Sequence, residues 1–206
     1  SGYCVPGGRI EFRQNRRRMF PTHKPGFRQL AVLSLILAAT IGPGAASAQV
    51  APDGGFSKPL KCTLDRDCWI INLPDAAGDK KVQDHRCGAR TYKGHKGTDF
   101  AVRDFRAADD GVDVIAAGPG LVTGVRDSAD EHFKLTAATS KLVGRKECGN
   151  GVIVQHSGGW ETQYCHMRKG SVAVKLADRV KRGDVLGRVG MSGKTDFPHV
   201  HISFRL

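Results

Sequence analysis

The sequence predicts a mainly β protein, an antiparallel β-sandwich or flattened barrel. Three observations lead to this fold class. Short runs of alternating or β-branched residues follow one another from residue 99 onward, glycine-containing turns separate them, and two of them flank Ser157-Gly158-Gly159 as a clear hairpin. No amphipathic helix is expected after residue 48, because no segment there repeats apolar residues with helical spacing.

The expected strands follow in order along the chain. The first lies within a cysteine-bearing stretch, and the last carries a pair of histidines. Between residues 126 and 147 the chain is polar and aperiodic, which indicates a long surface loop or a short helix, of the kind that often serves as a lid. The strands are predicted at residues 68–72, 99–102, 112–116, 121–125, 151–155, 160–166, 171–175, 184–189 and 199–201.

The N-terminal part has the features of a secretory signal. Residues 30–41 form an apolar run, shorter than the roughly 20 residues of a membrane span. Lys24 and Arg28 precede this run and small residues follow it at 46–48. Met19 stands at a natural start position. We therefore expect residues 1–18 to be upstream translated sequence or a cloning remnant, residues 1–48 to be absent from the mature protein, and cleavage to follow Ala48.

Cleavage would leave 158 residues, enough for a cysteine-bearing lead-in at 49–93 and one β-rich domain at 94–206. Seven of the 32 basic residues and one of the 20 acidic residues lie before residue 49, so the formal net charge falls from +12 to +6. These charges are scattered and aromatic residues are few, which argues against nucleic acid as a partner. The mild positive charge suits an anionic polymer, and an ordinary solvated surface explains it equally.

Five cysteines follow residue 48, and an exported protein would use them mainly in disulfides. If the hairpin turns near Gly158, Cys148 and Cys165 lie almost opposite each other, so we expect a disulfide between them. Cys68 and Cys87 are the second expected pair. The odd number leaves one thiol free or paired outside the chain. The spacing from Cys62 to Cys68 is not that of a zinc ribbon or a redox motif.

Histidines near both ends of the β-rich domain have the spacing of a metal site. On a strand, His199 and His201 point to the same side. His95 precedes Asp99 by four residues in a glycine-containing loop that can turn both side chains toward one ion. Imidazole and carboxylate are ligands that zinc accepts, and a catalytic site uses three of them. His166, at the end of a hairpin strand, adds another imidazole, so three groups could hold metal while two handle protons.

Several short motifs occur in one order between residue 94 and the end of the chain. Their combination resembles the lysostaphin-type zinc metallopeptidases, which cut peptide bridges in bacterial peptidoglycan, and in particular an exported, cysteine-containing subgroup. The motifs are residues 94–100 (GHKGTDF), 149–156 (GNGVIVQH), 159–167 (GWETQYCHM), 180–187 (VKRGDVLG), 190–193 (GMSG) and 198–201 (PHVH).

The resemblance implies one zinc ion per chain, held by His95, Asp99 and His201, with His166 and His199 as catalytic histidines. Strand alternation places Tyr164 on the same face as His166, as a candidate for holding that ring or the transition state, and places Cys165 on the opposite face. No role is assigned to the remaining histidines of the domain and lead-in, His85, His132 and His156.

The implied function is a periplasmic or secreted zinc endopeptidase that hydrolyses the peptide cross-links of peptidoglycan by metal-activated water. No stable membrane anchor is expected after signal cleavage. No glutamate base of the H-E-x-x-H kind accompanies the ligands, so one of the two catalytic histidines must accept the proton.

Two other interpretations remain at this point. One is a non-catalytic module of the same fold that binds the wall or activates another hydrolase. The other, a lipoyl-type carrier hairpin suggested by residues 180–187, does not account for the histidines and aspartate. The resembling proteins continue further beyond the His-x-His strand than this chain, which ends at Leu206, so we expect that strand to lack part of its usual support.

Overall fold

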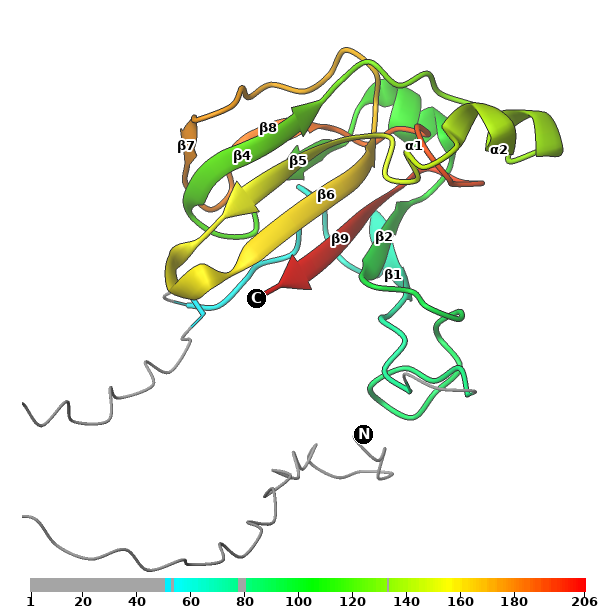
Figure 1. Cartoon of the computed structure of the whole chain (residues 1–206), viewed down its shortest axis with the longest axis horizontal. Coiled ribbons are helices and arrows are strands. Elements are labelled where there is room, and N and C mark those ends of the chain that lie inside the picture. Colours follow the sequence, from blue (N-terminus) through cyan, green and yellow to red (C-terminus); the bar gives the residue numbers. More distant parts are fainter. Residues whose placement is uncertain (1–50, 53, 78–80, 133) are drawn as a thin grey trace, which may run out of the picture.

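Strands form where the sequence alternates, and seven of them build one antiparallel sheet in the order β1-β2-β9-β6-β5-β4-β7 (Figure 1). The computed structural model describes residues 51–52, 54–77, 81–132 and 134–206. The predicted mainly β fold is confirmed. The strands of this sheet are β1 (Cys68–Asn72), β2 (Thr98–Val102), β4 (Gly120–Arg126), β5 (Asn150–Gln155), β6 (Glu161–Met167), β7 (Arg179–Val180) and β9 (His199–Arg205).

A second sheet pairs β3 (Asp113–Ile115) with β8 (Val185–Arg188) and contributes to the same hydrophobic core. Because side chains alternate along a strand, one face of the large sheet supplies Val154, Tyr164 and Val200 to this core. Val114 and Leu186 come from the small sheet, and all five side chains are completely buried. The opposite face of β2, β6 and β9 is therefore left to carry polar side chains.

The predicted hairpin is formed by β5 and β6 around a short 3-10 turn at Ser157–Gly159. The predicted disulfide between Cys148 and Cys165 is present, with Cα atoms 4.7 Å apart. The pairing of the hairpin is interrupted near this disulfide. Between the pairs Val152–Tyr164 and Asn150–Met167, two residues of β6 face one residue of β5, which makes a β-bulge.

The predicted pairing of Cys68 with Cys87 is wrong. Cys68 pairs instead with Cys62, because a tight turn in which Thr63 accepts the amide of Asp67 brings their Cα atoms to 6.1 Å. Cys87 is also disulfide-bonded, so none of the described cysteines is a free thiol.

Two short helices connect strands, α1 (Phe105–Asp110) and α2 (Ala137–Val143). The sequence did not predict α1, since six residues are too few to show an apolar stripe; Asp104 caps it by accepting from the amide of Ala107. The second helix lies inside the 126–147 segment, where a loop or a short helix was expected, and it stands at the periphery of the molecule (Figure 1). Neither helix has the length needed to cross a membrane.

One expected strand is absent from the described residues, at 171–175. Turns occupy both of its ends, where the Ser171 amide donates to the Arg168 carbonyl and the Lys175 amide donates to the Asp178 carboxylate. The signal peptide, its start at Met19 and its cleavage after Ala48 lie outside the described residues.

Candidate active site

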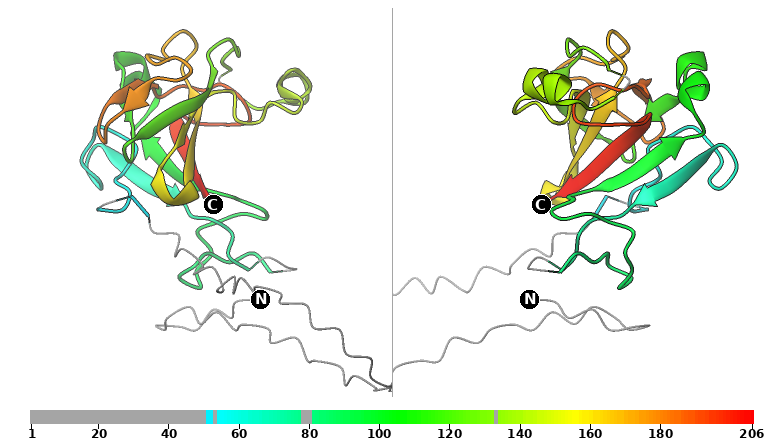
Figure 2. Two further views of the ribbon diagram at one scale, coloured as in Figure 1. Left: turned by 60° about the vertical axis from the view of Figure 1, so that its left-hand side comes forward. Right: turned by 90° about the vertical axis from the view of Figure 1, so that its right-hand side faces the viewer.

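His95 lies at the end of the connection between β1 and β2, which projects beyond both strands (Figure 2). Asp75 fixes its backbone, because the Asp75 amide donates to the His95 carbonyl (2.8 Å) and the Asp75 carboxylate accepts from the Gly94 amide (2.9 Å). The ring Nδ1 of His95 donates to the Leu73 carbonyl at 2.8 Å, and Tyr92 stacks on the ring. Since Nδ1 carries the proton, Nε2 has a free lone pair.

Asp99 and His201 are paired directly across β2 and β9, so their side chains leave the same face of the sheet. Asp99 Oδ1 lies 2.8 Å from His201 Nδ1 and 3.1 Å from His95 Nε2. The other carboxylate oxygen of Asp99 accepts from Asn72 Nδ2 at 2.9 Å. Gly97 makes room for this arrangement, because a Cβ atom there would lie 2.6 Å from His201 Nε2.

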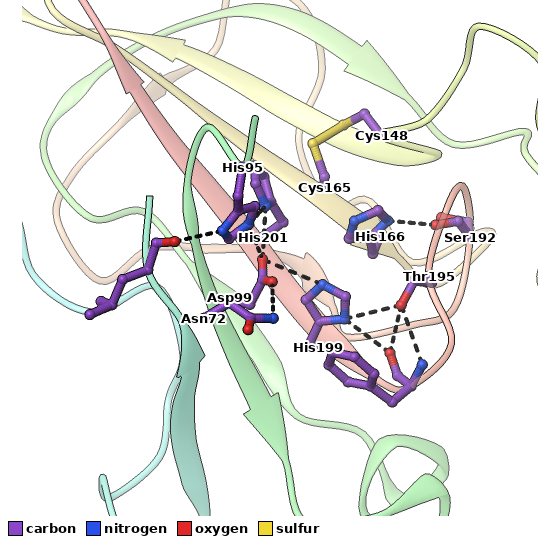
Figure 3. Close-up of polar contacts among 12 residues, drawn as sticks. Asn72, His95, Asp99, Cys148, Cys165, His166, Ser192, Thr195, His199 and His201 are labelled. Carbon is purple, nitrogen blue, oxygen red and sulfur yellow. Dashed lines mark hydrogen bonds and ion pairs between the residues drawn. A yellow bond between two sulfur atoms is a disulfide. The ribbon is translucent and has the colours of Figure 1, made fainter. Parts of the chain in front are cut away.

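His95, Asp99 and His201, here called the ligand cluster, have donor atoms that fit one zinc ion. The two ring nitrogens are 3.1 Å apart, and all three donor atoms lie within 4.8 Å of one another (Figure 3). Around a tetrahedral zinc ion with bonds of about 2.0–2.1 Å, ligand atoms are roughly 3.3 Å apart. The spacing and the N, N, O chemistry therefore suit a three-ligand zinc site with a fourth position open.

His166 reaches the same face through the β-bulge. Its backbone is left-handed, with φ of +64°, and this breaks the alternation of β6. Cys165, which pairs with His201 across β6 and β9, and His166 both lie on the site face, whereas the buried Tyr164 accepts the Ala117 amide in the core at 2.8 Å. The expectation that Tyr164 shares a face with His166, and that Cys165 lies opposite, is wrong because the bulge adds a residue to the strand.

His166 and His199, here called the histidine pair, lie side by side with ring centroids 4.7 Å apart (Figure 3). His166 Nδ1 donates to the Ser192 carbonyl at 2.8 Å. His199 Nδ1 donates to the Phe197 carbonyl at 3.0 Å and lies 3.1 Å from the Thr195 hydroxyl. In both rings this leaves Nε2 as a hydrogen-bond acceptor. Nε2 of His199 is 3.6 Å from the carboxylate of the ligand cluster.

Burial and hydrogen bonding set the charges of the site. Burial alone would raise the pKa of Asp99, but hydrogen bonds with His201 and His95 hold it well below its ordinary value. Burial lowers the pKa of His166 to about 3, and the neighbouring His199 adds to the shift. Burial also lowers the pKa of His199. The histidine pair is therefore neutral near pH 7 and able to accept protons.

The structure brings together all five side chains singled out in the sequence. His156 lies elsewhere, hydrogen-bonded to the Pro119 carbonyl and to Thr162. His85 lies in the β1–β2 connection and His132 in the 126–147 segment. Sequence reasoning missed the groups that orient the rings. Ser192 stood in a quoted motif and Asn72 in a predicted strand, but neither was given this role. The others, Leu73, Thr195 and Phe197, gave no signal in the sequence.

Comparisons with known proteins find a peptidase family and several peptidases among the similar proteins. The family model of Peptidase family M23 matches residues 93–206. Peptidoglycan DD-endopeptidase ShyC of Vibrio cholerae is 31% identical over 112 residues, which are 54% of this chain and 20% of that protein. DD-carboxypeptidase/endopeptidase Mpg of Neisseria meningitidis serogroup B is 32% identical over 117 residues, 56% of this chain and 21% of that protein. The chain thus spans about a fifth of the length of these curated relatives.

Among solved structures, the catalytic domain of the antimicrobial peptidase lysostaphin from Staphylococcus simulans is similar, with a TM-score of 0.41 and 20% identity. The match covers 67% of this chain and 78% of the solved one.

Proposed function

Because the chain belongs to peptidase family M23, we propose that it is a zinc-dependent endopeptidase that hydrolyses peptide cross-links of bacterial peptidoglycan. One observation carries the proposal. Three donor atoms from opposite ends of the β-rich domain meet within 4.8 Å of one another, and two neutral histidines lie beside them. The substrate class is inferred from the name of ShyC, a peptidoglycan DD-endopeptidase, and the name of Mpg also describes an endopeptidase.

The ligand cluster is assigned to one zinc ion per chain. A zinc ion there would supply Lewis acidity at the scissile carbonyl and a nucleophile at neutral pH. Two of the three ligands are held in place by hydrogen bonds. Asn72 donates to the carboxylate of Asp99, and the Leu73 carbonyl accepts from the ring of His95, which orients both groups for zinc binding.

The histidine pair is assigned to proton transfer. Nε2 of one of the two rings accepts the proton of the attacking water as the water oxygen bonds to the scissile carbonyl carbon. The same proton then passes to the amine nitrogen as the C–N bond breaks. The carbonyls of Ser192 and Phe197 accept from the Nδ1–H groups and stabilise the imidazolium that forms. Its positive charge lies beside the oxygen that becomes negative in the tetrahedral intermediate.

The proposed location is the periplasm or the extracellular space, with residues 19–48 serving as the export signal. Disulfides persist in oxidising compartments, and the described residues contain the Cys62–Cys68 and Cys148–Cys165 bonds. The stem peptides of the wall would be the partner, without a stable membrane anchor.

The test is to incubate the protein with purified sacculi and to identify the released muropeptides by mass spectrometry. We expect new free amine termini, their loss with a chelator and their return with added zinc. Zinc-loaded protein that binds sacculi but releases nothing would contradict the proposal and indicate a non-catalytic wall-binding or hydrolase-activating module.

A further inference from the structure

A disulfide lies directly beside the candidate active site. Cys165 precedes His166 in the chain, faces His201 across β6 and β9, and is bonded to Cys148 (Figure 3). We propose that the Cys148–Cys165 disulfide is a positioning device for His166, needed for turnover and dispensable for zinc binding. The inference rests on the proposed role of His166.

Cys148 holds two consecutive residues of the bulge. Its sulfur is bonded to Cys165, and its carbonyl accepts the amide of His166 at 2.8 Å. At the bulge the β5–β6 ladder has one residue of β6 too many to pair. Cys148, which lies before β5, holds the two bulged residues at this position instead.

The bulge needs such a restraint because of its backbone. His166 has φ of +64°, which a residue with a side chain adopts only when its surroundings impose it. Tyr164 and Met167, on either side of the bulge, are completely buried in the core. If the two bulged residues relaxed toward regular alternation, the His166 ring would turn away from His199 and toward the core face.

The same segment also holds the group that orients the ring. A Cβ atom on Gly149 would lie 2.5 Å from Ser192 Oγ, so the two backbones approach closely only because residue 149 is glycine. The amide of Asn150 donates to Ser192 Oγ at 2.8 Å, and the Ser192 carbonyl accepts from His166 Nδ1 at 2.8 Å. The disulfide therefore anchors residues 148–150, which hold the His166 backbone through the Cys148 carbonyl and the His166 ring through Ser192.

The ligand cluster has supports of its own besides the β6–β9 pair in which Cys165 faces His201. Asp99 and His201 are held by the β2–β9 ladder, and the carbonyl of Leu73, the residue after β1, holds His95. A disulfide of this loop length also stabilises a fold in general by restricting the unfolded chain. The test must therefore separate positioning of one ring from general stability.

The test compares Cys148→Ser/Cys165→Ser with Cys62→Ser/Cys68→Ser, a control that opens the other disulfide, away from the bulge. Both proteins are loaded with zinc and assayed on sacculi at a temperature where circular dichroism shows them folded. NMR follows the Nδ1–H resonance of His166, assigned by its absence in His166→Ala. Because a misplacement of about 1 Å can cost about 100-fold in rate, we expect kcat of the first variant to fall at least about ten-fold.

In that variant KM and zinc content should stay at the wild-type values while the His166 Nδ1–H resonance is lost, and the control should keep both kcat and the resonance. A folded first variant with unchanged kcat and resonance would overturn the proposal. If it does not fold, Cys148→Ala/Cys165→Val fills the space with apolar atoms, and unfolding of that protein too would assign the disulfide to the fold instead. If the wild type releases no muropeptides, the proposed function fails, and the resonance still decides the role of the disulfide.

Discussion

The ligand cluster and the histidine pair share one face of the sheet but are built in different ways. The ligand cluster depends mainly on regular structure, because Asp99 and His201 face each other in the β2–β9 ladder. Neighbouring β1 supplies a partner to Asp99, and the residue directly after β1 supplies one to His95. The histidine pair depends on irregular backbone. His166 sits in a bulge, and both rings are oriented by carbonyls of the loop before β9. Metal affinity and turnover should therefore respond to different substitutions.

The largest effect is expected when a member of the ligand cluster is removed. In His201→Ala or Asp99→Ala, two donors remain, so zinc content should fall from about one per chain to about zero, with complete loss of wall-lytic activity. Metal analysis after dialysis against a weak chelator measures this, with His85→Ala as a control outside the site. Tight zinc binding retained by His201→Ala would remove the ligand assignment.

Substitution in the histidine pair should separate the two properties. In His166→Ala and in His199→Ala, zinc stays at the wild-type content, while kcat falls by about 10²–10⁴-fold, the usual contribution of general acid–base catalysis. The same zinc analysis and the rate of muropeptide release are measured on one preparation. Normal turnover in both variants would end the catalytic assignment.

A milder change on the ligand side is Asn72→Ala, which removes the hydrogen bond to Asp99 Oδ2. Partners of metal ligands typically contribute about 10–100-fold to metal affinity, so we expect a weaker zinc Kd in this range. At saturating zinc, turnover should be close to normal. A competition titration with a chromophoric chelator measures the affinity, and an unchanged Kd would show that β1 does not support the site.

The matched change on the other side is Thr195→Val, which removes the hydroxyl 3.1 Å from His199 Nδ1 and keeps the side-chain shape. The same hydroxyl also donates to the Phe197 carbonyl at 2.8 Å, so both partners of the His199 ring are loosened. If this costs the transition state about 1 kcal/mol, kcat falls about five-fold, with unchanged zinc affinity. If Thr195→Val weakens zinc binding, or Asn72→Ala slows turnover at saturating zinc, the two parts of the site are not separable as described.

The same contrast explains what could be predicted from sequence. The alternation of His199 and His201, and the glycines around His95, predicted a metal site, because strand periodicity and tight turns are local properties. The division of the five side chains into three ligands and two catalytic histidines came only from the resemblance to the lysostaphin-type peptidases. The faces of Tyr164 and Cys165 relative to His166 were predicted wrongly from the same periodicity. The bulge at His166 is formed by a cysteine and a histidine rather than a glycine, and it depends on contacts with Cys148 that are distant in sequence.

Disulfide pairing shows the same limit. The Cys148–Cys165 bond could be predicted, since a hairpin sets which residues lie opposite each other. Pairing of Cys68 with Cys62 depends on a turn with no strong local signal. The helix α1 was missed because six residues are too few to show a helical repeat of apolar residues. The orienting groups of Leu73 and Phe197 were missed because they are backbone carbonyls, which every residue has.

His156 belongs neither to the ligand cluster nor to the histidine pair, so it serves as a buried histidine whose substitution should change stability and leave zinc binding and turnover unchanged. Burial lowers its pKa in the folded protein, with Nδ1 donating to the Pro119 carbonyl at 2.7 Å. The unfolded chain, with an ordinary pKa of about 6.5, then binds more protons, so this residue makes the free energy of unfolding fall as the pH drops below about 6.5. In His156→Gln the fall should be smaller, as measured by denaturant unfolding between about pH 7 and pH 5. Zinc content and turnover at pH 7 should stay unchanged, and a loss of either would extend the site across the sheet to its core face.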